Sequence, residues 1–142
     1  MRPDDVPVLA LLRQSMSFHS ERQRVIAENV ANANTPGYTP KDLDQADFAR
    51  ALRQEMDTQG GRGVQLQTTH EGHIQGSRAN APARTWETSE TPDSETTING
   101  NSVVLEEQMV RAQETRMQYE GALTLYQKSL GLIRMAIKSP GR

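Results

Sequence analysis

The longest regular pattern in the chain alternates spacings of four and three residues from Leu105 to Ile137 without a slip. Every position in this pattern carries an apolar or aromatic side chain, apart from Arg116. The pattern predicts a helix of about 35 residues, which would be roughly 50 Å long. A strict seven-residue repeat of that length predicts left-handed supercoiling against another helix. We expect Asn101 or Ser102 to cap its start.

A second amphipathic helix is predicted near the start of the chain. Asp5 is a good N-cap, and Pro7 is tolerated in the first turn. The helix should stop where Pro36 disfavours helical geometry at the preceding residue. Its apolar stripe is broader than a two-chain seam requires, which suggests contact with more than one neighbour. The stripe comprises Leu9, Leu12, Met16, His19, Gln23, Ile26, Val30 and Ala33, and Val8, Leu11, Phe18 and Val25 widen it. We expect His19 to lie at a subunit contact rather than to bind a ligand.

The stop itself is rich in asparagine. Pro36 and Gly37 suit the two central positions of a type II turn, where the glycine supplies the positive φ. Amide side chains both donate and accept, so they can bond free carbonyls at a helix end or on a neighbouring chain. No side chain in this stretch suits a nucleophile, an acid, a base or a metal ligand. We therefore expect a turn for docking, made by Asn29, Asn32, Asn34, Thr35, Pro36, Gly37 and Tyr38.

The middle of the chain is polar. A short helix is predicted over residues 42–56, with Asp42 or Asp44 as its cap and the nearby acidic side chains complementing its dipole. Residues 64–68 alternate as a short strand does, and residues 75–97 are expected to be extended or disordered in the isolated chain. Trp86 is interpreted as a hydrophobic anchor onto a partner or onto the N-terminal helix. His70 and His73 lack a third ligand for a metal site, and Asp42, Asp44 and Asp47 are not interpreted as a metal or acid–base site.

Composition limits the classes of function. The 142 residues suit one domain, but only 35% are hydrophobic and few are aromatic, so a large globular core is not expected. The net charge is −2, and acidic and basic residues are well mixed along the chain, which excludes the basic surface patch that nucleic-acid binding needs. Cysteine is absent, and we expect no cleaved signal peptide and no membrane-spanning segment. We predict no catalytic residue, no cofactor, no metal, no nucleic acid and no small-molecule substrate.

The predicted fold is mainly α. Long N- and C-terminal amphipathic helices are expected to pair as an antiparallel coiled-coil hairpin. The middle segment between them is expected to be largely irregular, with a short helix and room for one short strand. Residues 1–38, 39–100 and 101–142 form the three parts, and both ends make one structural domain. One helix pair leaves much of both stripes uncovered, so we expect a monomer with frayed termini that orders on assembly. Heterologous contacts that do not close give helical tubes. The predicted packing residues are Leu12, Met16, Ile26, Val30, Met109, Tyr119, Leu123, Tyr126, Leu130, Ile133 and Ile137.

The run N-V-A-N-A-N-T-P-G-Y at residues 29–38 resembles the N-terminal signature of the flagellar axial proteins, the family of the rod, hook and hook-associated proteins. Residues 66–74 and 99–109 are similar to those of its short proximal rod members. The resemblance covers about residues 8–56 and 98–138. Val104 departs from it, since the family usually carries an acidic residue there, and this concerns the capping of the C-terminal helix.

The resemblance implies a structural subunit of the proximal rod in the basal body, on the periplasmic side of the inner membrane. It implies export by the flagellar type III apparatus without a cleaved signal peptide, and polymerisation into the helical tube that transmits torque and surrounds the export channel. The implied partners are other copies of the chain, other proximal rod subunits, the FliE-type rod adaptor, the inner collar of the membrane ring and the export gate.

Two alternatives belong to other classes. A free-standing coiled-coil adaptor or secretion chaperone predicts a stable helical dimer at low concentration. A small wall-cleaving hydrolase would need two carboxylates at a fixed separation on a rigid scaffold. The carboxylates nearest to a possible pocket, Glu71 and Glu87, fall in the segment predicted to be least structured.

Overall fold

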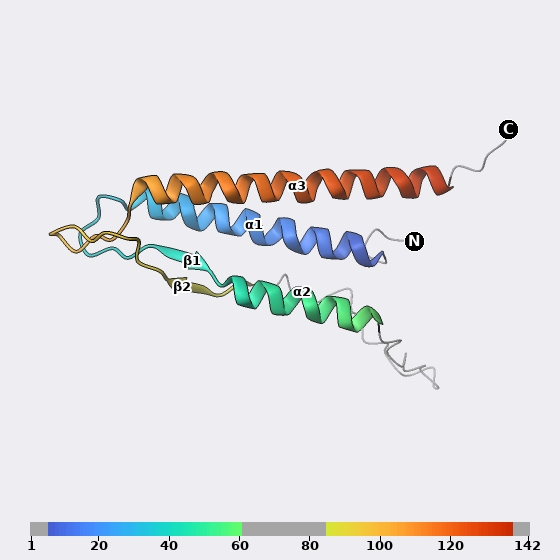
Figure 1. Ribbon diagram of the computed structural model, residues 1–142, viewed down its shortest axis with the longest axis horizontal. Coiled ribbons are helices and arrows are strands. Elements are labelled where there is room, and N and C mark those ends of the chain that lie inside the picture. The colour runs from blue at the N-terminus through green and yellow to red at the C-terminus, as the bar shows by residue number, and fades with distance from the viewer. Residues whose placement is uncertain (1–5, 61–84, 138–142) are drawn as a thin grey trace, which may run out of the picture.

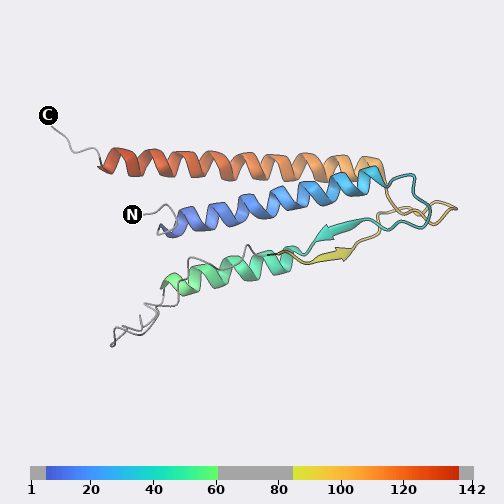
Figure 2. The ribbon, with the colours of Figure 1, turned by 180° about the vertical axis from the view of Figure 1, so that it is seen from behind.

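Two long helices dominate the computed structural model, which describes residues 6–60 and 85–137. The elements in chain order are α1 (Pro7–Ala31), β1 (Lys41–Leu43), α2 (Gln45–Gly60), β2 (Thr88–Glu90) and α3 (Leu105–Ile137). Helices α1 and α3 lie side by side and antiparallel, so that the start of α1 and the end of α3 share one end of the molecule (Figures 1 and 2). This confirms the mainly helical fold with paired terminal helices.

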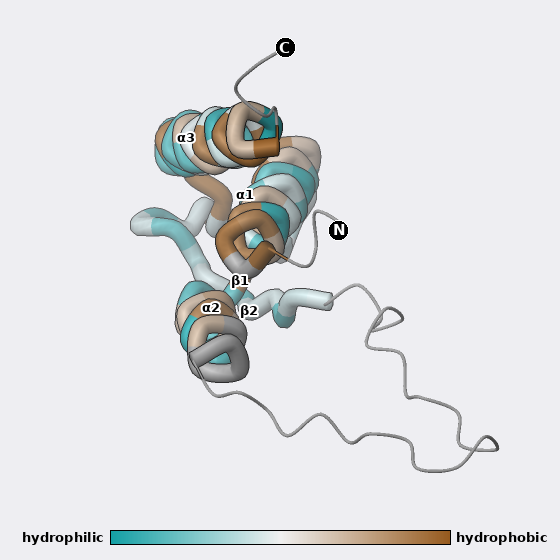
Figure 3. Tube along the Cα trace, turned by 90° about the vertical axis from the view of Figure 1, so that its right-hand side faces the viewer, coloured by the Kyte–Doolittle hydropathy of each residue, from teal (hydrophilic) through white to brown (hydrophobic). Residues whose placement is uncertain are grey.

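Helix α1 lies between two neighbours. Helix α3 packs along one side of it, and α2 with the β1–β2 pair lies on the other side (Figure 1). The end-on view of Figure 3 shows the same arrangement, with apolar and polar residues alternating around α3. Among the described elements α3 contacts α1 alone. The broad apolar stripe of the N-terminal helix therefore does meet more than one neighbour, within its own chain. No helix in the described ranges is both long enough and apolar enough to cross a bilayer.

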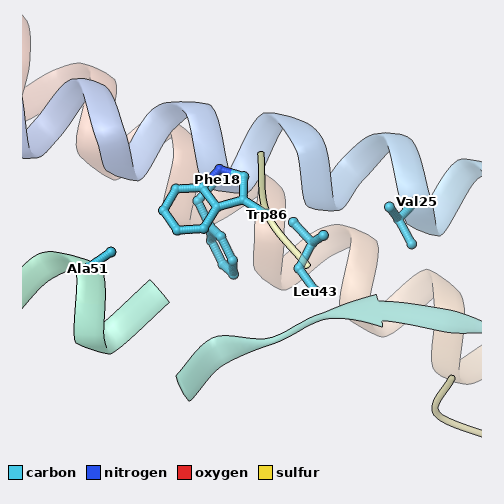
Figure 4. Close-up of a cluster of buried hydrophobic side chains, with 5 residues drawn as sticks. All are labelled: Phe18, Val25, Leu43, Ala51 and Trp86. Atoms are coloured by element: carbon cyan, nitrogen blue, oxygen red, sulfur yellow. The ribbon is translucent and has the colours of Figure 1, made fainter. Parts of the chain in front are cut away.

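The apolar core lies between α1 and the middle segment (Figure 4). Phe18 of α1 stacks on Phe48 of α2 with ring centroids 4.2 Å apart. Trp86 meets Phe18 edge to face, at a centroid distance of 5.1 Å. The prediction that Trp86 anchors onto the N-terminal helix is confirmed. The members of this core are Phe18, Val25, Leu43, Ala51 and Trp86.

The first turn of the predicted short helix is instead a strand. Residues 41–43 pair antiparallel with residues 88–90, with Leu43 opposite Thr88. The Asp42 carboxylate binds Arg22 of α1 through two hydrogen bonds of 2.8 and 2.6 Å, and this ion pair holds the segment extended against α1. Asp44 then caps α2, since its Oδ1 accepts from the Ala46 N–H at 2.7 Å. The cap at Asp44 is confirmed, and a helix start at Asp42 is wrong.

The start of α1 and the position of His19 also differ from expectation. Pro7 does open the first turn, but the N-cap is Val6, which makes no side-chain cap. Asp5, the strand predicted at residues 64–68, and His70 with His73 lie outside the described residues.

His19 is 8% exposed and meets the rings of Phe18 and Phe48 inside the chain rather than at a subunit contact. Burial, aided by the charge of Arg22, lowers the pKa of His19.

Candidate functional site

The predicted Pro-Gly turn follows the end of α1. The Tyr38 N–H donates to the Thr35 carbonyl at 3.3 Å, which closes a four-residue turn with Pro36 and Gly37 at its centre. Gly37 has φ +70°, as the third position of a type II turn requires. An added Cβ at Gly37 would meet no atom within 4 Å, so only the backbone conformation favours glycine here. The predicted turn geometry is confirmed.

Asn29 joins α1 to three other segments and is 1% exposed. Its Oδ1 accepts from the Lys41 N–H at 2.9 Å and from the Tyr38 hydroxyl at 3.1 Å. Its Nδ2 donates to the Lys41 carbonyl at 2.7 Å and to Gln108 Oε1 of α3 at 3.1 Å. The amide thus bonds both backbone groups of one residue in β1, as a neighbouring strand would. All of its donors are used, so one side chain holds the turn, β1 and α3 against α1.

The chain of polar contacts continues from Gln108 to the start of α3. Gln108 is 0% exposed, and its Nε2 donates to the Asp93 carboxylate at 2.9 and 3.2 Å. Asp93 also pairs with Arg111 Nη1 at 2.8 Å and accepts from the Val104 N–H at 2.8 Å. This carboxylate therefore supplies negative charge at the N-terminus of α3, where the resemblance leads one to expect an acidic residue at position 104. We call Tyr38, Asn29, Gln108, Asp93 and Arg111 the Asn29 network.

Asn101 caps the end of α1 and not the start of α3. Its Nδ2 donates to the carbonyls of Asn32 and Thr35, at 3.0 and 2.7 Å. These carbonyls follow the last turn of α1, and each also accepts a backbone N–H, from Thr35 and from Tyr38 respectively. Its Oδ1 accepts from the Val103 N–H at 2.9 Å, and α3 begins only at Leu105. The predicted cap at Asn101 or Ser102 is therefore wrong.

A second turn lies against the first. The Gly100 N–H donates to the Thr97 carbonyl at 2.9 Å, and Gly100 has φ +80°. The Gly37 N–H donates to the Asn99 carbonyl at 3.0 Å. A Cβ added at Gly100 would lie 3.4 Å from the Gly37 Cα, so the two backbones approach closely. Both turns together form the end of the molecule opposite to the start of α1 (Figure 1).

The remaining predicted turn residues divide into contacting and exposed ones. Asn32 Nδ2 donates to the Glu28 carbonyl at 2.8 Å, and the Thr35 hydroxyl donates to Asn32 Oδ1 at 3.2 Å. Asn34 and Pro36 are exposed. Desolvation by burial, with the nearby Glu28 charge, raises the pKa of Tyr38. Sequence reasoning missed the roles of Asp93 and Gln108, although Gln108 falls within residues 99–109, which carry part of the resemblance.

The residues of α3 that are buried against α1 are not those of the predicted apolar stripe. They lie next to that stripe around the helix. The buried residues of α3 are Gln108, Thr115 and Ala122, spaced by seven. Of the predicted packing residues, Ile26 is buried, and Val30, Met109 and Ile137 are 41%, 69% and 72% exposed. The others are partly buried: Leu12, Met16, Tyr119, Leu123, Tyr126, Leu130 and Ile133. The pairing within the chain thus leaves part of the predicted stripe uncovered.

The contacts of the site are those of a structural joint. Its members form hydrogen bonds and ion pairs with one another, and the residues within 6–60 and 85–137 include no group of three potential metal ligands. The site combines neutral amides with one carboxylate that already holds a guanidinium. This arrangement can fix the geometry between the long helices and the middle segment.

Sequence comparisons relate the chain to flagellar rod proteins. The family model described as flagella basal body rod protein matches residues 15–39, which include the end of α1 and the type II turn. The flagellar basal body rod protein FlgB of Escherichia coli strain K12 is 30% identical over 120 residues, covering 82% of this chain and 82% of the relative. FlgB of Salmonella typhimurium strain LT2 is 28% identical over 121 residues, covering 82% and 83%. FlgB of Proteus mirabilis strain HI4320 is 39% identical over 64 residues, or 44% of each chain.

Proposed function

The chain belongs to the family of the flagellar basal body rod protein FlgB, and from this premise we propose that it polymerises in the proximal rod, as a subunit of the helical tube that transmits torque and surrounds the export channel. Membership gives the chain a structural role in the flagellar basal body rod. That family is one of structural proteins and not of enzymes.

The observation that carries the proposal is the uncovered apolar surface of α3. Outside the buried Gln108–Thr115–Ala122 face, α3 carries large apolar side chains at several positions around the helix, and these are 55% to 64% exposed. An apolar surface of this length on a monomer marks an interaction surface. These side chains are Val110, Met117, Leu125, Leu132 and Met135.

In this function the turn and the helices have separate tasks. The turn residues Asn29, Asn32, Asn34, Thr35, Pro36, Gly37 and Tyr38 fix the angle between the long helices and the middle segment. The packing residues, among them Val30, Met109 and Ile137, which are exposed in the single chain, meet neighbouring subunits. The proposed partners are other copies of the chain, other proximal rod subunits, the FliE-type adaptor, the inner collar of the membrane ring and the export gate. The rod lies on the periplasmic side, and the chain reaches it without a cleaved signal.

The test uses basal bodies purified from the bacterium that makes this protein. We expect cells without the chain to be non-motile and to lack a complete rod, and a plasmid copy to restore both. The restored chain should be recovered in the basal bodies. Complete rods in cells without the chain would contradict the proposal. Light scattering and circular dichroism on the pure protein add a second test, since a stably helical dimer at low concentration would indicate the free-standing adaptor instead.

A further inference from the structure

The two ends of the helix pair carry opposite charge. Residues 85–104, which pass through the end with the two turns, contain Glu87, Glu90, Asp93 and Glu95 and no lysine or arginine. Residues 7–20 and 121–137, the halves of α1 and α3 farthest from the turns, contain Arg13, Lys128 and Arg134 and no aspartate or glutamate. Asp93 is neutralised by Arg111, but Glu87, Glu90 and Glu95 are exposed. Among these described segments, the one at the turns is therefore acidic, and the opposite halves of α1 and α3 are basic.

The acidic end also presents an apolar side chain on a well-defined turn. Ile98 is fully exposed, at 110% of the reference area. Its turn is closed by the Thr97 N–H bond to the Asn101 carbonyl at 2.7 Å and the Gly100 N–H bond to the Thr97 carbonyl. The single Thr97 hydroxyl proton faces two acceptors, Asn99 Oδ1 and the Asn101 carbonyl. We call Glu95 with Ile98 the acidic tip.

The basic end offers a surface of matching chemistry. Lys128, Leu132 and Met135 are spaced by four and three residues, so they share one face of α3. Leu132 and Met135 are 63% and 64% exposed, and Lys128 is exposed beside them. Lys128 makes no ion pair within residues 6–60 and 85–137. We call these three residues the basal face.

We propose that the acidic tip of one copy docks on the basal face of a second copy, with Ile98 between Leu132 and Met135 and Glu95 beside Lys128. The proposal rests on the polymerisation proposed above and gives that polymerisation a direction. A tip-to-tip contact would place like charges together and is disfavoured. Because the tip and the basal face are different surfaces at opposite ends, each bound copy keeps one of them free, and such a heterologous contact extends without closing on itself.

Cross-linking between single-cysteine copies tests this contact, because the chain has no cysteine of its own. Full-length chains carrying Thr96→Cys, near Ile98, and Ser129→Cys, beside Lys128, are mixed and treated with a short bis-maleimide. Thr96 is exposed and Ser129 is partly exposed, and the docking side chains themselves are retained. We expect the mixed adduct to form in preference to either homodimer, and its yield to fall several-fold between about 50 mM and about 500 mM salt, since exposed charges are screened. Met117→Cys, 57% exposed in the middle of α3, replaces Ser129→Cys as the matched control and should give little adduct.

Charge reversal supplies the second readout. Lys128→Glu in the Ser129→Cys chain should lower the adduct yield several-fold, and Glu95→Lys in the Thr96→Cys chain should restore it. Both side chains are exposed, so neither change should affect folding. Equal yield with Met117→Cys, dominant homodimers, absence of the mixed adduct or absence of rescue would each overturn the proposal. If the wild-type chain is nevertheless found in purified basal bodies, the rod function stands and only this contact fails.

Discussion

Asn29 is a side chain whose chemistry suits its position closely. The site needs two donors and an acceptor that takes two hydrogen bonds, at 1% exposure, and a neutral amide provides all of these. An aspartate would place a carboxylate against the Lys41 carbonyl and Gln108 Oε1, both of which accept hydrogen bonds. A leucine would fill the volume but leave the Lys41 backbone groups unpaired, and buried unpaired groups are costly.

The first prediction concerns this residue. Asn29→Ala should lower the free energy of unfolding by roughly 2–4 kcal/mol, because at least the Lys41 N–H and Gln108 Oε1 lose their partner in a buried place. Asn34→Ala, a change of the same kind at an exposed position five residues away, should change it by less than about 0.5 kcal/mol. Urea unfolding followed by Trp86 fluorescence measures both. Equal effects of the two changes would contradict the role given to Asn29.

A second prediction at this scale concerns pH. His19 has a lowered pKa because it is buried and lies near Arg22. The unfolded chain, with an ordinary pKa of about 6.5, therefore binds more protons than the folded chain as the pH falls below that value. Stability should be complete above the unfolded pKa and decline as the pH falls toward the folded pKa. His19→Gln should reduce the loss of unfolding free energy between about pH 7.5 and about pH 5.5; an unchanged pH dependence would show that His19 does not titrate on unfolding.

At the scale of elements, the start of α3 depends on a segment far from it in the sequence. Asp93 approaches from the stretch after β2, accepts from the Val104 N–H and holds both Gln108 and Arg111. Arg111 also pairs with Glu107 at 3.3 Å, as the spacing of four predicts. The first two turns of α3 are thereby tied to the middle segment, so the middle segment and α3 should order together.

The prediction for this element is that Asp93→Ala loosens the start of α3. The change removes a buried carboxylate and should cost about 2–3 kcal/mol, at the lower end for a broken ion pair because Arg111 keeps some contact with water. Amide hydrogen exchange should rise in residues 105–111 and remain near its original level in residues 120–130. Glu95→Ala, an exposed acid two residues away, is the control and should leave the exchange unchanged.

Local patterns account for the parts of the structure that could be predicted. The spacing of apolar residues predicted both long helices, and Pro36–Gly37 predicted the turn. The isolated Trp86 was predicted as an anchor, and it packs on α1. The α3 seam could not be predicted in this way, because Gln108 and Thr115 are polar and their burial depends on α1. Asp93 has no local signature either, since the partners of its carboxylate begin eleven residues later at Val104. The strand at 41–43 depends on Arg22, which pairs with Asp42 across twenty residues.

At the scale of the whole molecule, the core and the joint occupy different places. The aromatic core joins α1 to α2 and β1, whereas the α1–α3 seam is partly polar. Helix α3 is thus joined to the rest of the chain by the Asn29 network at one end and by its seam with α1, and it presents apolar side chains that neither contact covers. This division suits a subunit whose long helices complete their packing only against other subunits.

The last prediction tests the turn in the assembled state. Gly37→Val should strain the backbone by about 1–2 kcal/mol, because φ +70° is unfavourable for a β-branched residue although the site has space for the side chain. The helix content of the monomer should stay nearly unchanged, since α1 ends at Ala31 and α3 begins at Leu105. Without the bond from the Gly37 N–H to the Asn99 carbonyl, the two turns should separate, and the copies should no longer present their ends at a common angle. Swimming in soft agar and recovery of the chain in basal bodies measure the result.

Gly37→Asn is the control: asparagine tolerates positive φ, so this variant should retain most of the motility. Full motility of Gly37→Val cells would show that the turn does not set the geometry of assembly.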